Sequence, residues 1–218
     1  MSKLKIGVLA SGRGSNFQSI IDAINSGQLN AHIAILITDN ASAFAIERAK
    51  KHGIEHLVMD IREYGSKDDY FEKIAMEMKK RGVELVVLAG FMRIVKKPLI
   101  DAFPNKIMNI HPAILPAFPG LHGQKQALEY GVKISGCTVH FVDDGMDTGP
   151  IIIQAAVPIF HGDTEETLSE RILKLEHKIY PEAIRLFSEG RLEIDARIVR
   201  IKDNIPFDTF LINPPFKN

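Results

Sequence analysis

The sequence predicts an α/β fold, with a Rossmann-like, mostly parallel twisted sheet flanked by helices and with antiparallel strands in the C-terminal half. Short apolar runs alternate with segments of helical period through the first half of the chain, as expected for a parallel sheet covered by helices. The run 85–89 is apolar at every position, which is typical of a parallel strand buried on both faces. In the second half, the strand-like runs are separated by long loops that contain glycine and proline.

The elements of the first half follow one another as strand, helix, strand, helix, strand, helix and strand. The expected strands cover residues 6–10, 33–38, 57–59 and 85–89. The expected helices follow residue 16, cover 43–51 and centre on the apolar face formed by Phe71, Ile74, Ala75 and Met78. This order implies right-handed crossovers between parallel strands.

The second half is expected to contain three strands, one long helix and a short final pair of strands. The three strands cover 107–110, 137–142 and 151–159, and the helix runs from about Thr164 to Phe187 with residues 164–167 as its start. Residues 192–194 and 198–201 are expected to form a hairpin or a sheet edge, and Pro206, Pro214 and Pro215 make the last dozen residues loop-like. We expect a single domain over residues 1–218.

Composition describes an ordinary globular chain and narrows the classes of function. Lys plus Arg and Asp plus Glu are equal at 27 each and the pI is about 7.1, which argues against a large nucleic-acid footprint or a polybasic membrane surface. The apolar run 6–10 is too short for a signal peptide core or a membrane span. Because Cys137 is the only cysteine, we expect no intrachain disulfide, a cytoplasmic protein and a small core residue at this position.

A hydrogen-bond donor and a titratable base stand at the end of one expected strand. Asn109 and His111 are two residues apart, so their side chains share one face of the strand. Pro112 favours extended geometry at the preceding His111. An amide that stabilises an oxyanion and an imidazole that titrates near neutrality are typical of acyl transfer. The same residues are equally consistent with a strand exit that carries two incidental polar side chains.

The segment 11–16, with the sequence SGRGSN, joins the first strand to the first helix. Backbone N–H groups and the helix dipole favour an anion there, and the first βα turn of a parallel sheet is a frequent ligand site. Phe17 stands where a dinucleotide fingerprint needs a small residue, and the Gly-Lys-Ser/Thr of a P-loop is absent. We interpret the segment as a cradle for one phosphate, with Ser15 and Asn16 as donors, while a tight turn that caps the helix is the alternative.

Two further loops carry candidate residues. The apolar segment 90–95 indicates a pocket wall for a flat, partly apolar ligand, or else a strand end that packs into the core. The acidic turn 143–150 lacks the spacing of an EF-hand, and the chain has neither a His-Glu-x-x-His pattern nor paired cysteines, so we expect no metal site. One carboxylate of this turn could orient His111, although a solvated acidic turn explains the composition as well.

Glu176 borders the apolar stripe of the long helix, which consists of Leu168, Ile172, Leu175 and Ile179. An unpaired buried carboxylate is costly, so this side chain needs a partner. The partner is expected to be either a basic side chain or the amine or hydroxyl groups of a substrate.

Together these segments resemble the 10-formyltetrahydrofolate-dependent formyltransferases, and within them the phosphoribosylglycinamide formyltransferase branch. The resemblance runs from residue 5 to about 193 and rests on segments 11–16, 88–94, 109–116, 119–122, 144–150 and 176–181. The Asn-x-His-Pro motif with a downstream aspartate is shared by the superfamily, whereas Gly14-Ser15-Asn16 at this place is more specific to the branch. Minor departures are Gly123-Gln124 after His122, and Cys137 at a position that is often hydroxylic.

The resemblance implies formyl transfer from the co-substrate 10-formyltetrahydrofolate to the amine of glycinamide ribonucleotide, without a metal ion. It implies that Asn109 binds the formyl oxygen, that His111 is the general acid/base, and that Asp147 holds His111 through water. The residues implied to bind the nucleotide are Gly14, Ser15, Asn16 and Glu176. Those implied to bind the folate are Lys67, Met92, Arg93, Ile94, Val95 and Asn109, with Thr138 and His140 lining the same pocket. The domain would then divide into a phosphate-binding half at 1–100, a catalytic and folate-binding half at 101–190 and an extension at 191–218.

Other classes of protein share parts of this pattern. A methionyl-tRNA formyltransferase has the same Asn, His and Asp but is expected to carry a basic RNA-binding extension, which does not suit a neutral chain. A formyltetrahydrofolate hydrolase is expected to carry an amino-terminal regulatory domain, and we expect no room for one before Lys5. A non-catalytic phosphate-binding α/β domain is the third alternative. The expected partners are small molecules, with no nucleic acid and no membrane, and the expected state is a monomer or homodimer.

Overall fold

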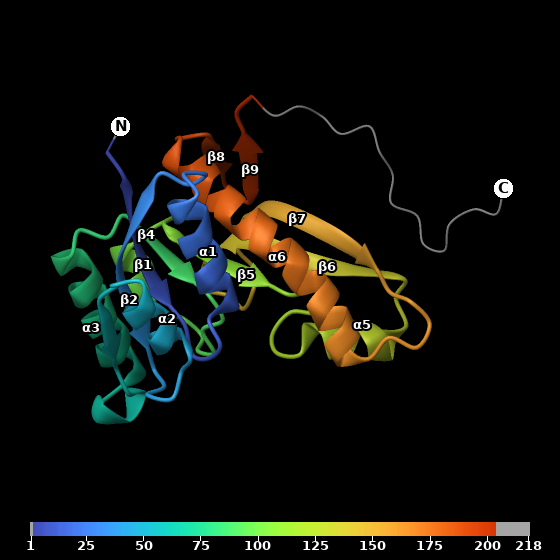
Figure 1. Cartoon of the computed structure of the whole chain (residues 1–218), viewed down its shortest axis with the longest axis horizontal. Helices are drawn as coiled ribbons and strands as arrows, with labels where there is room; N and C mark the ends of the chain where they lie inside the picture. The colour runs from blue at the N-terminus through green and yellow to red at the C-terminus, as the bar shows by residue number, and fades with distance from the viewer. Residues whose placement is uncertain (1, 204–218) are drawn as a thin grey trace.

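The computed structural model describes residues 2–203, which form a sheet between two layers of helices (Figure 1). The strands are β1 (Leu4–Leu9), β2 (Ala31–Thr38), β3 (His56–Val58), β4 (Leu85–Leu88), β5 (Ile107–His111), β6 (Ile134–Phe141), β7 (Ile151–Pro158), β8 (Leu192–Asp195) and β9 (Ile198–Ile201). The helices are α1 (Ser15–Asn25), α2 (Ala45–Lys51), α3 (Lys67–Lys80), α4 (Lys97–Ala102), α5 (Gly123–Tyr130) and α6 (Glu165–Ser188), with a 3₁₀ turn η1 (Ile61–Glu63). The loop-like tail expected around Pro206, Pro214 and Pro215 lies outside the described residues.

The strands form one sheet in the order β3-β2-β1-β4-β5-β6-β7-β9-β8. The pairings from β3 to β5 are parallel, whereas β6 is antiparallel to β5 and β7, and β8 is antiparallel to β9. The predicted α/β class with antiparallel strands in the C-terminal half is therefore confirmed. The chain runs outward from β1 to β3 and then enters β4 on the other side of β1. Open α/β sheets bind ligands at the carboxyl ends of strands where the order reverses in this way.

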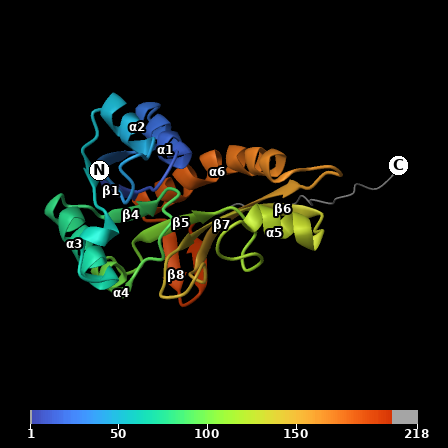
Figure 2. The same ribbon diagram turned by 90° about the horizontal axis from the view of Figure 1, so that it is seen from below.

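Helices cover both faces of the parallel part of the sheet. Figure 2 shows α1, α2 and α6 on one side and α3 and α4 on the other. Alternate residues of β1 point to opposite faces of the sheet. Ile6 and Val8 pack in the same cluster as Phe17 of α1. Leu9 packs in the other cluster, with Phe71 of α3. Gly7 also faces α3, because a Cβ added there would lie 3.1 Å from Met78. Both sides of the strand are buried, which explains its uninterrupted apolar run.

Helix α6 begins where the sequence predicts and is attached to the centre of the sheet. The Thr164 hydroxyl accepts the Thr167 N–H (3.3 Å) and the Thr167 hydroxyl accepts the Thr164 N–H (3.0 Å), which forms a capping box. Further along the helix, the Tyr180 hydroxyl lies 2.9 Å from the carbonyl oxygens of both Leu88 and Met108. Leu88 is the last residue of β4 and Met108 the second residue of β5, so the contact attaches α6 to these two neighbouring strands.

Two short helices, α4 and α5, lie where the sequence predicts loops. Helix α5 follows His122, which is left-handed with φ 60°, and ends at Gly131 with φ 81°. Neither helix carries an apolar stripe, because the buried residues are Leu99 alone in α4 and Gly123 and Ala127 in α5. Predicted boundaries also differ by up to three residues, as the first strand begins at Leu4, the second helix at Ala45 and β6 at Ile134. No helix within residues 2–203 is both long and apolar enough to cross a membrane.

Candidate functional site

The loops after β1 and β4 are joined at the point where the strand order reverses. The Ser11 N–H donates to the Gly90 carbonyl (3.0 Å), and the Ser11 hydroxyl accepts the Met92 N–H (2.9 Å). β5 lies beside β4, with Asn109 in register with Leu88. The predicted phosphate loop, the predicted pocket wall and the Asn109 motif therefore share one edge of the sheet.

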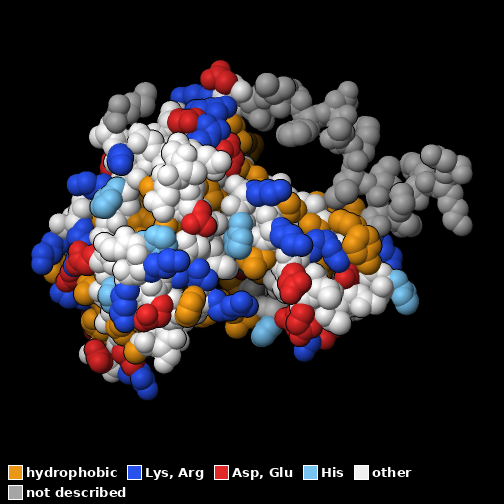
Figure 3. All heavy atoms as spheres, viewed as in Figure 1, with side chains coloured by type: hydrophobic (Ala, Val, Ile, Leu, Met, Phe, Trp, Pro, Cys, Tyr) orange, Lys and Arg blue, Asp and Glu red, His pale blue; other side chains and the backbone are white. Residues whose placement is uncertain are grey.

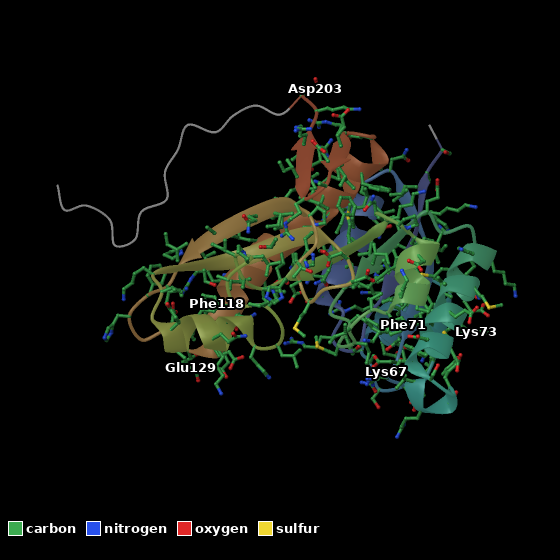
Figure 4. The ribbon with its side chains drawn as sticks, turned by 180° about the vertical axis from the view of Figure 1, so that it is seen from behind. Lys67, Phe71, Lys73, Phe118, Glu129 and Asp203 are labelled. Atoms are coloured by element: carbon green, nitrogen blue, oxygen red, sulfur yellow. The ribbon has the colours of Figure 1, made fainter. Side chains whose placement is uncertain are left out.

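A cavity of about 620 Å³ opens at this edge. The predicted residues that line it are Met92, Arg93, Ile94, Val95, Asn109, His111, His140 and Asp147. Met92 and Ile94 are 64% and 54% exposed, so they form an open apolar wall, whereas Val95 packs inward. Lys67 does not line the cavity; it is the first residue of α3 (Figure 4). Its contact with a folate tail therefore stays a prediction.

Polar side chains converge in this cavity from β5, β6 and the loop after β6. The antiparallel register sets Asn109 opposite His140 and His111 opposite Thr138. Asn109 Nδ2 lies 3.2 Å from His140 Nε2. Asp147 faces both histidines, with Oδ2 3.4 Å from His111 Nδ1 and Oδ1 3.6 Å from His140 Nε2. The arrangement combines an amide donor, two imidazoles and one carboxylate.

His111 is only 4% exposed and has an acceptor at each ring nitrogen. Its Nε2 lies 2.8 Å from the Phe118 carbonyl oxygen. A carbonyl can only accept, so Nε2 carries a hydrogen. Nδ1 lies 3.4 Å from Asp147 Oδ2. Phe118 and Asp147 therefore orient the imidazole from both sides.

Asp147 joins the loop after β6 to the segment before α5. Its Oδ2 accepts the Gly120 N–H (2.8 Å), and its backbone is left-handed with φ 54°. Burial raises the pKa of the Asp147 carboxyl, but His140, the Gly120 N–H and His111 lower it, and the net pKa lies below its usual value. A charged carboxylate is therefore held against the two histidines near neutral pH.

The glycine loop opens α1 as the sequence predicts. Gly14 adopts φ 65° and ψ 36° immediately before Ser15 and Asn16, the first residues of the helix. The first N–H groups of a helix have no intrahelical partner, and no side chain of residues 2–203 caps this end. The loop therefore presents backbone donors and a positive helix end to an anion.

Two groups of helix α2 donate hydrogen bonds to backbone carbonyls of the glycine loop. The Ala45 N–H donates to the Gly12 carbonyl (3.1 Å), and Arg48 Nε donates to the Arg13 carbonyl (2.9 Å).

Arg48 and Ser15 also line a second cavity of about 870 Å³ in the seam between α1 and α6. Figure 3 shows that basic and acidic side chains are interspersed over this face of the molecule.

Glu176 is 7% exposed, and its partner is Asn16 rather than a basic side chain. Asn16 Nδ2 donates to Glu176 Oε2 (2.7 Å). Burial raises the pKa of Glu176, and although the Asn16 hydrogen bond lowers it, the net pKa is above its usual value. Asn16 Oδ1 is buried without a hydrogen-bond partner among the described residues. The pair thus offers acceptor capacity to donors of a ligand beside the glycine loop.

Several residues that shape the site were missed by the sequence analysis. Phe118 contacts His111, and Gly120 contacts Asp147. Both contacts use backbone atoms, so the identity of the side chain does not reveal them. Asp39 accepts from Arg93 Nε (2.6 Å) and orients this guanidinium at the cavity wall. The signal for Asp39 is its place directly after β2, at the same edge of the sheet.

Two residues of β6 are structural. The Thr138 hydroxyl donates to the Ala113 carbonyl (2.7 Å) and accepts the Leu115 N–H (3.0 Å), so it supports the segment after β5 without lining the cavity. Cys137 is fully buried, and burial raises the pKa of its thiol to about 12. Among residues 2–203, no group of three or more His, Cys, Asp or Glu side chains is arranged to hold a metal ion.

Comparison with known proteins agrees with this geometry. Residues 4–184 match the family model described as formyl transferase. The chain belongs to this family. The phosphoribosylglycinamide formyltransferase of Bacillus subtilis is 45% identical over 181 residues, which are 83% of this chain and 93% of the relative. The crystal structure of glycinamide ribonucleotide transformylase 1 from Symbiobacterium toebii has a TM-score of 0.91 and 54% identity, and covers 92% of this chain and 95% of that one.

The relatives that match this chain also include a much longer protein. The trifunctional purine biosynthetic protein adenosine-3 of Drosophila pseudoobscura pseudoobscura is 46% identical over 206 residues, or 94% of this chain. The chain spans only 15% of the length of that relative. The family resemblance stated from the sequence is confirmed.

Proposed function

We propose that the protein transfers the formyl group of 10-formyltetrahydrofolate to the amine of glycinamide ribonucleotide, a step of purine synthesis. The observation that carries the proposal is the convergence of Asn109, His111 and Asp147 in one cavity at the edge where the glycine loop opens α1. The names of relatives at 45% and 54% identity support the choice of substrates.

The proposed reaction forms one C–N bond and breaks another. The substrate amine attacks the formyl carbon, and the formyl oxygen gains negative charge in a tetrahedral intermediate. Asn109 Nδ2 donates to that oxygen, a contribution worth on the order of 10²–10³ in rate for a preorganised donor. As the bond from the carbon to folate N10 breaks, the proton lost by the amine must reach N10. His111 carries this proton, and Asp147 orients the ring and stabilises its charged form.

The two ligands are proposed to approach the Asn109 motif from different loops. The nucleotide phosphate would bind the free N–H groups at the start of α1, with Gly14, Ser15 and Asn16 around it and Glu176 accepting from the ribose or glycinamide. The folate would lie along the open wall of residues 92–95, with its tail toward Lys67. The proposal involves these small molecules alone, without a metal ion, in a monomer or homodimer.

The test is a formyl-transfer assay with both substrates, comparing the wild-type protein with His111→Asn, Asn109→Ala and Asp147→Asn. We expect kcat to fall by about 10²–10⁴ in the first two variants, because each loses a group that acts in the transition state. His32→Asn is the matched control, since His32 is exposed on β2. Undiminished turnover by His111→Asn contradicts the catalytic assignment. Transfer to methionyl-tRNA, with none to glycinamide ribonucleotide, contradicts the proposed acceptor.

A further inference from the structure

His140 is the second histidine of the cluster, and the proposed chemistry gives it no step. It is 2% exposed and lies directly across the β5–β6 ladder from Asn109. Its Nδ1 is 2.8 Å from the Phe141 carbonyl oxygen, and its Nε2 is 3.2 Å from Asn109 Nδ2. Both ring nitrogens therefore have a hydrogen-bond partner in this structure.

The Phe141 and Asn109 contacts determine the tautomer of the ring, because Asp147 Oδ1, at 3.6 Å from Nε2, lies beyond hydrogen-bond distance. The Phe141 carbonyl can only accept, so Nδ1 must carry the hydrogen. A neutral imidazole has one N–H, which leaves Nε2 with a lone pair and makes it an acceptor. The Asn109 amide must then turn its NH₂ group, and not its oxygen, toward Nε2, because an amide oxygen there would face a lone pair.

We infer that His140 is a positioning residue, which in its neutral, Nδ1-protonated form holds the Asn109 amide with its NH₂ group toward the cavity. One amide hydrogen binds His140 Nε2, and the other stays available to an oxygen that enters the site. The consequence for catalysis rests on the proposed function, in which Asn109 donates to the formyl oxygen. The orientation itself follows from the contacts of His140 alone.

Protonation of His140 at Nε2 removes the acceptor that orients the Asn109 amide. Nε2 then becomes a donor, cannot accept from Asn109, and has the Asp147 carboxylate oxygen 3.6 Å away as its acceptor. Asp147 also faces His111, while the neighbour of His140 on β7 is the apolar Ile151. Only the neutral ring therefore keeps Asn109 as a donor toward the substrate.

The first test needs no substrate and reads the ring nitrogens directly. Long-range ¹H–¹⁵N correlation spectra of the full chain with ¹⁵N-labelled histidine, assigned through a His140→Gln sample, report the tautomer of His140 above neutral pH. We expect a protonated Nδ1 and a bare Nε2. A protonated Nε2 at that pH overturns the inference, whatever reaction the protein catalyses.

The second test compares two variants that carry the same amide group and differ in reach by one methylene. Asn at position 140 is too short to reach Asn109, whereas the amide of Gln at position 140 spans about the same reach as the imidazole and can offer both a donor and an acceptor. We expect kcat of His140→Asn to fall by about 10- to 100-fold with a nearly constant KM, which is less than the loss of a whole oxyanion donor. His140→Gln recovers most of that loss.

Controls separate this inference from its alternatives. His32→Asn on β2 keeps the wild-type kcat, and thermal unfolding of both His140 variants checks that they fold. Equal losses in His140→Asn and His140→Gln, with matching losses of stability, show a packing role only and overturn the inference. If the wild-type protein forms no product, the proposed function fails, while the nuclear magnetic resonance result still decides the orientation of Asn109.

Discussion

At the scale of single residues, Gly14 is the position of the glycine loop with the least tolerance for a side chain. Its φ of 65° costs any L-residue about 1–2 kcal/mol, and an added Cβ would lie 2.8 Å from the Cβ of Ala45. We expect Gly14→Ala to destabilise the protein and to raise KM for glycinamide ribonucleotide at least tenfold, since the backbone donors move. Steady-state kinetics and urea unfolding measure the two effects.

Gly12 provides the matched control for this prediction. It belongs to the same loop, yet an added Cβ would meet nothing within 4 Å and its φ is not left-handed. We expect Gly12→Ala to retain stability and KM close to the wild-type values. If both variants behave alike, the left-handed geometry of Gly14 does not matter for the loop.

Glu176 predicts a dependence of stability on pH at the same scale. Its pKa is raised by burial, so the folded protein binds the proton more tightly than the unfolded chain does. The stability from this group is present below its unfolded pKa of about 4.5 and is lost as pH rises through the folded pKa. Glu176→Gln removes the ionisation and should become more stable, relative to wild type, as pH rises across that window.

Urea unfolding between pH 4 and pH 8.5 measures this difference. Glu170→Gln is the control, because Glu170 is an exposed residue of the same helix. Wild type and Glu176→Gln with parallel stability profiles would show that the carboxyl is not affected by burial in the folded state.

At the scale of the elements, the start of α6 was predicted by sequence and is formed by a specific pair of hydroxyls. Thr164→Ala removes the side-chain acceptor of the Thr167 N–H, and we expect the free energy of unfolding to fall by about 0.5–2 kcal/mol. Chemical denaturation measures the change. Ser169→Ala, inside the same helix, should be neutral or slightly stabilising. A similar loss in Ser169→Ala would assign the effect to general helix propensity and not to the cap.

The elements recovered from sequence are those whose apolar period is long enough to be detected. The strands β1, β2 and β4 and the helix α6 carry runs or stripes that match their buried faces. α4 and α5 lacked such a signal, because each has few buried residues and its ends are set by local backbone geometry. His122, for example, adopts the left-handed conformation before α5 although it is not a glycine.

At the scale of the whole molecule, some contacts between the candidate residues were predictable from the sequence and others were not. Asn109 and His111 share a strand face by spacing alone, so their proximity was predictable. Asn16 and Glu176 are separated by 160 positions, and only the packing of α6 against α1 brings them into contact. The role of His140 depends on the antiparallel register of β5 and β6, which no local pattern specifies.

Tyr180 connects the parts of the molecule on which this packing depends. Its hydroxyl lies 2.9 Å from carbonyl oxygens 92 and 72 positions away, on β4 and β5. Tyr180→Phe removes the donor inside a fully buried environment, and we expect the free energy of unfolding to fall by about 1–3 kcal/mol. The midpoint of urea unfolding should decrease while the m-value stays constant, since the same surface is exposed on unfolding.

The matched control is Tyr130→Phe, which removes the same atom from a residue that is 79% exposed. We expect no change in stability from this variant. We also expect a lower kcat for Tyr180→Phe, because the ends of β4 and β5 carry the cavity wall and Asn109. Unchanged stability in Tyr180→Phe would mean that α6 is held by apolar packing alone, and the hydrogen bonds to the two strands would then be dispensable.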